Sequence, residues 1–162
     1  KCINLSNVVF VIIGKGTELS KLKQDVQTCV IKNIVIMENL SREAYFALLP
    51  HCKVGLISLH QNFSVPNTPM KMNDYLNARI PILASIDRAT DLGELLVKNK
   101  MGLYAYADSP DDLFRNFMQL YQDEELRKCM GINGFEFCQK NLSVEKTCQD
   151  IIQHSAVGFS EW

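Results

Sequence analysis

Short apolar runs recur along the chain and alternate with segments of helical periodicity. The runs are nearly continuous and rich in β-branched residues, which is typical of strands buried on both faces of a parallel sheet; they span 8–13, 34–37, 54–59, 82–85 and 102–106. The other segments repeat apolar residues at three or four positions; they span 18–28, 42–49, 69–76, 90–98, 109–121, 124–140 and 143–154. This alternation predicts an α/β fold with a doubly wound parallel sheet.

Composition and charge argue against several classes of function. The 162 residues carry 17 basic and 18 acidic side chains, for a net charge of -1, so no basic surface for nucleic acid or an anionic membrane is indicated. None of the six cysteines stands in a CxxC pair or a Cys/His ligand spacing, which predicts reduced thiols in a cytoplasmic protein and no metal site. No run of about 18 apolar residues predicts a membrane span in this segment.

A glycine-containing loop follows the first apolar run. Gly14, Lys15 and Gly16 stand between a predicted strand and a predicted helix, where a loop can approach a phosphate closely. The third glycine of a dinucleotide fingerprint is absent because Leu19 occupies its place, so nicotinamide binding is a weak interpretation. A tight turn that brings the backbone close to a ligand is favoured. Glu38 and His60 also follow strands, and solvated loop residues are the simpler interpretation of both.

The segment before the fourth apolar run carries the strongest candidate site. Pro69 suits the first position of a helix, with Thr68 as its N-cap. The amides of Met70 and Lys71, with the Lys71 ammonium group, would then face an anion. Asp74 lies one turn later on the same face. The pattern predicts that phosphates bind at the helix start and ribose hydroxyls at the carboxylate. The alternative is that Pro69 only marks the start of a helix and that Lys71 and Asp74 form a solvated ion pair.

Taken together and in their order along the chain, these motifs resemble those of the C-terminal, donor-binding domain of GT-B glycosyltransferases, in particular the retaining family four of bacterial polysaccharide synthesis. Residues 11–19 match the family's strand, Gly-x-Gly loop and helix, and 33–43 match its next strand and nucleobase loop. Its Pro-Ser-Lys-x-x-Glu-Tyr-Leu segment is similar to Pro69-Met70-Lys71-x-x-Asp74-Tyr75-Leu76. Its closing pattern matches 102–103, 108–110, 126–127, 130–134 and 143–146. The similarity covers nearly the whole chain and implies a Rossmann-like fold.

The chain departs from the family pattern at several positions. Asp74 stands where the family usually has glutamate, and Pro66 where many members have another glutamate. Met70 replaces a serine, while Glu38 and Arg79 replace glycines. The family's first strand and helix, with the Arg and Lys that clamp the donor diphosphate, would precede this sequence, as would the acceptor-binding domain. The resemblance thus implies a donor domain truncated at its N-terminus. We expect it over residues 1–142, followed by a C-terminal helix and tail over 143–162.

The resemblance also implies a function. We expect transfer of a hexose or N-acetylhexosamine from a nucleotide sugar, with UDP as the first candidate, in bacterial surface polysaccharide synthesis (O-antigen of lipopolysaccharide, or capsule). The nucleotide would bind Gly14, Lys15, Gly16, Pro69, Met70, Lys71 and Asp74. The loop 62–67 would face the sugar. No catalytic residue is assigned, and no metal or further cofactor is implied.

The remaining expectations concern partners and rival functions. A glycan or lipid-linked acceptor would bind through the missing N-terminal domain, so we expect the isolated chain to be inactive. The full-length protein would be cytoplasmic and peripheral to the inner membrane. A sugar-nucleotide epimerase domain and a non-catalytic partner-binding module are the main alternatives, followed by a dinucleotide-dependent oxidoreductase.

Overall fold

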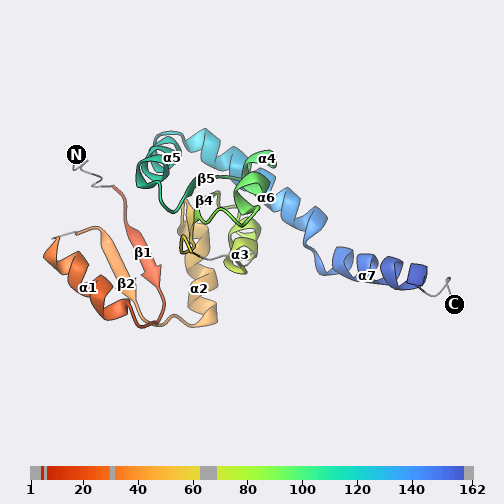
Figure 1. Cartoon of the computed structure of the whole chain (residues 1–162), viewed down its shortest axis with the longest axis horizontal. Helices are drawn as coiled ribbons and strands as arrows, with labels where there is room; N and C mark the ends of the chain where they lie inside the picture. Colours follow the sequence, from red (N-terminus) through yellow and green to blue (C-terminus); the bar gives the residue numbers. More distant parts are fainter. Residues whose placement is uncertain (1–4, 6, 30–31, 63–68, 159–162) are drawn as a thin grey trace. The chain divides into compact units, whose positions relative to one another are not determined.

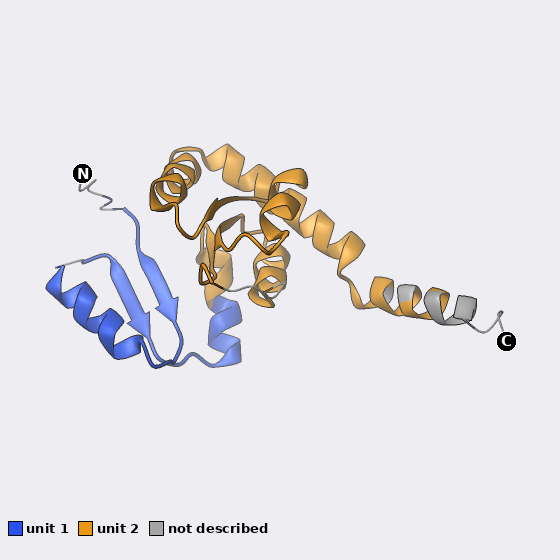
Figure 2. Ribbon diagram, in the orientation of Figure 1, with its two compact units in different colours: residues 1–47 blue, residues 48–162 orange. Residues whose placement is uncertain are grey.

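The computed structural model describes residues 5, 7–29, 32–62 and 69–158 of the chain. Parallel strands alternate with helices (Figure 1), so the predicted α/β class is confirmed. The chain forms two compact units, residues 1–47 and 48–162, which Figure 2 colours separately. Strands that the sequence predicts as one doubly wound sheet are paired as two sheets, one in each unit.

The first unit contains two short parallel strands connected by a helix. β1 (Phe10–Ile13) pairs with β2 (Ile34–Met37) in a register that places Phe10 opposite Ile34 and Ile13 opposite Met37. The connecting helix is α1 (Leu19–Thr28), and α2 (Arg42–Leu48) follows β2. The Ser41 hydroxyl accepts a hydrogen bond from the Ala44 amide (3.2 Å), so it caps α2.

The second unit is built on three parallel strands, in the order β3 (Gly55–Ser58), β4 (Ile82–Ile86) and β5 (Gly102–Tyr106). The helical elements are η1 (Leu49–His51), α3 (Lys71–Asn77), α4 (Leu92–Lys98), α5 (Pro110–Gln122), α6 (Glu124–Asn141) and α7 (Val144–Gly158). Every residue of the central strand β4 is buried. Because all three strands are parallel, their carboxyl ends meet at one edge of the sheet.

Two apolar clusters cover the two faces of this sheet. Ile82, Ala84 and Ile86 of β4 belong to one cluster, together with buried side chains of α3, α4 and α6. Leu83 packs in the other cluster with Leu120 of α5 and Met130 of α6. Side chains alternate along a strand, which is why neighbouring residues of β4 enter different clusters. The sheet is therefore held from both sides, and its strand ends are fixed in position.

Two glycines let α6 lie close to α3 (Figure 1). A Cβ atom at Gly131 would stand 2.1 Å from the carbonyl oxygen of Arg79, just beyond the end of α3. A Cβ atom at Gly134 would stand 2.7 Å from Cδ2 of Leu76. Arg79 has a positive φ of 57°, a conformation that costs little only for glycine. Its guanidinium lies over the Phe135 ring, 4.4 Å from the centroid.

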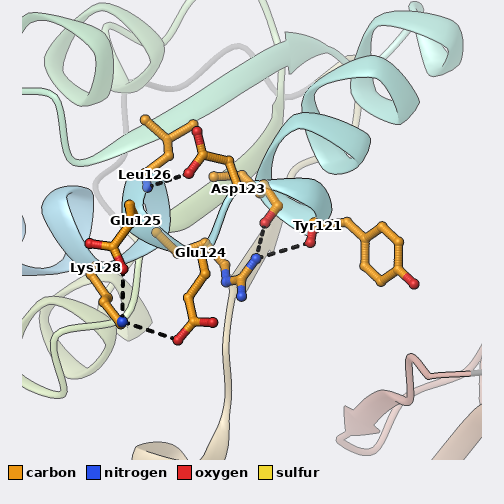
Figure 3. A network of polar contacts seen from close by, with 8 residues as sticks. Tyr121, Asp123, Glu124, Glu125, Leu126 and Lys128 are labelled. Atoms are coloured by element: carbon orange, nitrogen blue, oxygen red, sulfur yellow. Dashed lines mark hydrogen bonds and ion pairs between the residues drawn. The ribbon is translucent and has the colours of Figure 1, made fainter.

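A polar network joins α5 to α6 (Figure 3). The Asp123 carboxylate accepts a hydrogen bond from the Leu126 amide (2.8 Å) and so caps α6. The Arg127 guanidinium donates to the carbonyl oxygens of Leu120 and Tyr121, which belong to the last turn of α5. Asp123, between the helices, therefore satisfies a backbone amide at the start of α6, while the Arg127 side chain of α6 satisfies carbonyl oxygens at the end of α5. Lys128 adds exposed ion pairs to Glu124 and Glu125.

Some local expectations differ from the structure or fall outside it. The helical segment predicted from residue 109 begins at Pro110, and the Ser109 hydroxyl before it donates to Asp108 Oδ1 (3.2 Å) and makes no capping hydrogen bond. The last helix extends beyond the predicted 154, to Gly158. Pro66, Thr68 and loop positions 63–67 lie outside the described residues. The division into 1–142 and 143–162 stays a prediction.

Candidate functional site

The turn that starts α3 begins at Pro69. The Met72 amide donates to the Pro69 carbonyl (2.9 Å), and the Asn73 amide donates to the Met70 carbonyl (3.1 Å). Met70 has helical dihedral angles, φ −57° and ψ −32°, and precedes Lys71, the first residue of α3. Pro69 therefore stands two residues before α3 instead of at its first position, although it already closes a helical turn. Since α3 has only 7 residues, the charge of Lys71 matters more than the helix dipole.

Side chains of α3 divide between the core and the surface. Met72 and Leu76 are buried and anchor the helix. Lys71 is exposed, and Met70 is 86% exposed. Asp74 is half-buried and lies one turn after Lys71. The anchoring residues thus fix the helix, while a cation and a carboxylate are held one turn apart on it.

Among the described residues, no neighbouring atom explains why the loop after β1 contains glycine. The Gly14 amide continues the strand ladder by donating to the Met37 carbonyl (3.0 Å). In the part of the chain that the structure describes, a Cβ atom at Gly14 or Gly16 would meet no atom within 4 Å, and neither glycine has a positive φ. Lys15 between them is exposed. Without a side chain at Gly14 and Gly16, a ligand can approach the backbone closely, and a larger residue would hinder that approach.

Glu38 is engaged by a neighbouring cation. Its Oε1 lies 2.5 Å from the Lys23 ammonium of α1, and both side chains are about half exposed. The hydrogen bond from Lys23 is the main cause that holds the pKa of Glu38 below its ordinary value, followed by the charges of Lys23 and Lys15. Glu38 is therefore an exposed, ion-paired loop residue.

The predicted site residues fall into two groups that belong to different units. Gly14, Lys15 and Gly16 belong to the unit 1–47. Pro69, Met70, Lys71 and Asp74 belong to the unit 48–162. The structure brings the members of each group together, and binding of one nucleotide by both groups stays a prediction.

Polar residues that the sequence did not single out lie at the carboxyl edge of the second sheet. Ser58 and Ser85 are paired in the β3–β4 register and line a cavity of about 370 Å³ together with His60. Asp87 follows β4 and is only 3% exposed. Polar residues at the end of an otherwise apolar run, as in Ser85 and Asp87, are the signal that could have identified this edge.

An exposed ion pair borders the same edge. Arg88 donates to Asp108 Oδ2 (2.9 Å), and its guanidinium lies 4.2 Å from the centroid of the Tyr106 ring. The hydrogen bond from Arg88 is the main cause that holds the pKa of Asp108 below its ordinary value. Arg88, which follows β4, is thereby oriented by two partners at the end of β5.

The described residues contain neither a metal-binding cluster nor a membrane-spanning helix. Over the described ranges, no cluster of three or more His, Cys, Asp or Glu side chains could hold a metal ion. In the same part of the chain, no helix combines the length and the apolar character needed to cross a membrane.

The chain was compared with known proteins. The family model of the glycosyl transferases group 1 matches residues 2–137. A chitobiosyldiphosphodolichol beta-mannosyltransferase of Dictyostelium discoideum is 34% identical over 116 residues, which are 71% of this chain and 22% of that protein. An uncharacterized glycosyltransferase of Methanocaldococcus jannaschii is 29% identical over 136 residues, 81% of this chain and 36% of that protein. The chain thus spans about a third or less of these relatives' length.

A solved structure shows the same fold. Anabaena HepE, determined in complex with UDP, superposes with a TM-score of 0.76 at 14% identity, over 96% of this chain and 42% of that chain. At this identity the likeness concerns the fold, and it confirms the expected Rossmann-like architecture of GT-B enzymes. Because the family model matches residues 2–137 of the 162, the chain belongs to the glycosyl transferases group 1 family.

Proposed function

We propose that this chain forms the donor-binding part of a retaining glycosyltransferase that transfers a hexose or N-acetylhexosamine from a nucleotide diphosphate. UDP is the first candidate nucleotide, and surface polysaccharide, either O-antigen or capsule, is the proposed product. The acceptor would be a glycan or a lipid-linked glycan bound mainly by parts of the protein outside this chain. We propose a cytoplasmic location at the inner membrane surface.

The open loop at Gly14 and Gly16 is the observation that carries the proposal. Glycine lowers the stability of the folded state unless its flexibility or its small size is needed. Here neither a positive φ nor a neighbouring atom within 4 Å requires it. Close approach of a ligand to the backbone is a physical reason that remains, and a nucleotide is the ligand that family membership favours.

Lys71 and Asp74 supply the complementary chemistry. In glycosyl transfer through an oxocarbenium-like transition state, negative charge builds on the leaving diphosphate. The exposed ammonium group of Lys71 would stabilise that charge, together with the amides of Met70 and Lys71. Asp74, one turn later, would accept hydrogen bonds from the ribose hydroxyls.

The relatives support parts of this proposal. Family membership favours glycosyl transfer over the epimerase and oxidoreductase alternatives. The UDP complex of HepE supports a uridine nucleotide. The Dictyostelium relative is named for an acceptor linked to diphosphodolichol, and this supports a lipid-linked acceptor for the present protein. Since the chain spans only 22% of that relative, we propose that the isolated chain does not transfer sugar.

Calorimetric titration of the full-length protein with UDP tests the proposal. We expect Lys71→Ala and Asp74→Asn to weaken UDP binding about tenfold or more. Lys98→Ala is the matched control, because Lys98 is an exposed lysine in the last turn of α4, a helix that begins at the carboxyl edge of the sheet and ends away from it. Unchanged UDP affinity in both site variants, or equal weakening by Lys98→Ala, would show that the assignment is wrong.

A further inference from the structure

Strand β5 forms an open edge of the three-stranded sheet. It pairs with β4 on one side, and within the described residues no strand pairs with its other side. Peptide groups alternate in direction along a strand, and those of Leu103 and Ala105 bond to β4. The backbone groups of Tyr104 and Tyr106 therefore point away from the sheet. An edge of this kind can pair with a strand of another molecule.

The surface beside this open edge is hollowed. α5 follows β5 and packs against the sheet (Figure 1), but it leaves a cavity of about 270 Å³ along the strand. The cavity is lined by three strand residues and three helix residues: Tyr104, Ala105, Tyr106, Asp112, Arg115 and Asn116. The main chain of β5 can therefore be reached from the solvent at this place.

Both outward carbonyl groups at the cavity already accept hydrogen bonds. The Asn116 side chain of α5 donates from Nδ2 to the Tyr104 carbonyl (2.7 Å). The Ser109 amide donates to the Tyr106 carbonyl (2.8 Å) as the chain turns into α5. A side-chain amide donates through the same kind of N–H group as a peptide. Asn116 therefore occupies the hydrogen-bonding position that a residue of an added strand would take.

Two further contacts act in the same direction. Asn133 of α6 donates from its side-chain amide to the carbonyl of Lys100, just before β5 (3.0 Å). Arg115 and Asp112 form an ion pair on the wall of the cavity. Charged side chains at a sheet edge oppose pairing with another strand, because that strand would remove them from water. The edge is thus open in space, while its acceptors are occupied.

We propose that Asn116 prevents the open edge of β5 from pairing with a strand of a second copy of this chain. A second copy is the expected partner because it carries the same edge, and two equal edges can meet about a twofold axis. Such pairing requires that Asn116 first release the Tyr104 carbonyl. This role is separate from the proposed function, since no residue assigned to the nucleotide lies on this edge.

Sedimentation velocity of the full-length protein over a concentration series tests this inference. Asn116→Leu removes the donor and keeps a side chain of similar size, and Asn116→Ala removes it without adding apolar surface. We expect both variants to self-associate with a dissociation constant lowered about tenfold, because the competing hydrogen bond is gone. Gln119→Leu is the matched control, since Gln119 is an exposed amide of α5 that does not line the cavity. It should associate like the parent.

Hydrogen exchange then locates the contact. In the parent, the amides of Tyr104 and Tyr106 should exchange faster than those of Leu103 and Ala105, which bond to β4. In the associated Asn116→Leu protein, these two outward amides should exchange about tenfold more slowly. The inference is overturned if the outward amides of the parent are as protected as the inward ones, or if neither Asn116 variant associates more than the parent. Equal association of the control variant, or association that leaves the outward amides unprotected, would also overturn it.

Discussion

The glycines of the two units differ in the atoms that surround them. In the second unit, a Cβ atom at Gly131 would stand 2.1 Å from Arg79 O, and one at Gly102 would stand 2.3 Å from Ile82 O. In the first unit, a Cβ atom at Gly14 or Gly16 would meet no atom of the described residues within 4 Å. The glycines of the second unit are explained by its own packing, whereas we propose that those of the first unit are explained by a ligand that approaches the loop.

This comparison separates stability from binding. Substitutions at the packed glycines should lower the free energy of unfolding. Substitutions at the open glycines should leave it unchanged or raise it, and should affect only what the loop binds. The same residue type thus gives opposite expectations in the two units, and each expectation can be measured separately.

The largest effect is expected at Gly131. Its Cβ would collide with backbone, which cannot move aside as a side chain can, so Gly131→Ala should lower the free energy of unfolding by about 3 kcal/mol. Urea unfolding followed by circular dichroism measures this. Gly134→Ala is the control, because the nearest atom is the end of the Leu76 side chain, and it should cost about 1 kcal/mol. Equal losses would show that backbone contact does not set the cost.

The second effect concerns the joint between α5 and α6. Arg127→Ala removes donors to the carbonyl oxygens of Leu120 and Tyr121, and should lower the free energy of unfolding by about 1.5 kcal/mol. The control is Arg115→Ala, since Arg115 pairs with Asp112 at the surface and should contribute under about 0.5 kcal/mol. If the two variants unfold at the same urea concentration, the joint is not a stabilising feature.

A small gain in stability is expected at Gly14. Its φ is not positive and its surroundings are open, so Gly14→Ala should raise the free energy of unfolding by about 0.5 kcal/mol, by restricting the unfolded chain. Thermal unfolding of the parent and the variant, measured side by side, checks this. A loss above about 1 kcal/mol would mean that the fold itself needs this glycine, and the comparison between the units would fail.

The smallest effect depends on pH. The hydrogen bond from Arg88 lowers the pKa of Asp108 in the folded protein, so the pair stabilises the fold above the ordinary aspartate pKa of about 3.9. That contribution is lost as pH falls through the lowered folded pKa. Asp108→Asn should therefore slightly flatten the fall of the urea midpoint below about pH 4. A steeper fall in the variant would contradict the sign of this shift.

Most of the fold could be predicted because its signals are local. The apolar runs 34–37 and 102–106 coincide with β2 and β5, and the proline after Ser109 marks the start of α5. The pairing of the strands could not be predicted to the same extent. Each run is apolar on both faces, so its sequence carries little information about which neighbour it joins.

The candidate site was predictable only in part. Gly14, Lys15 and Gly16 follow a strand, as their pattern indicates, and Lys71 begins a helix. The cavity at Ser58, His60 and Ser85 depends on the register between β3 and β4, which no local pattern specifies. The burial of Asp87 depends likewise on contacts between distant segments.

Titration of the full-length Gly16→Ala protein with UDP tests the central claim most directly. If the loop after β1 is open because a nucleotide approaches its backbone, the added methyl group should weaken UDP binding about tenfold while the urea midpoint stays that of the parent. A variant that binds UDP as tightly as the parent would contradict the account.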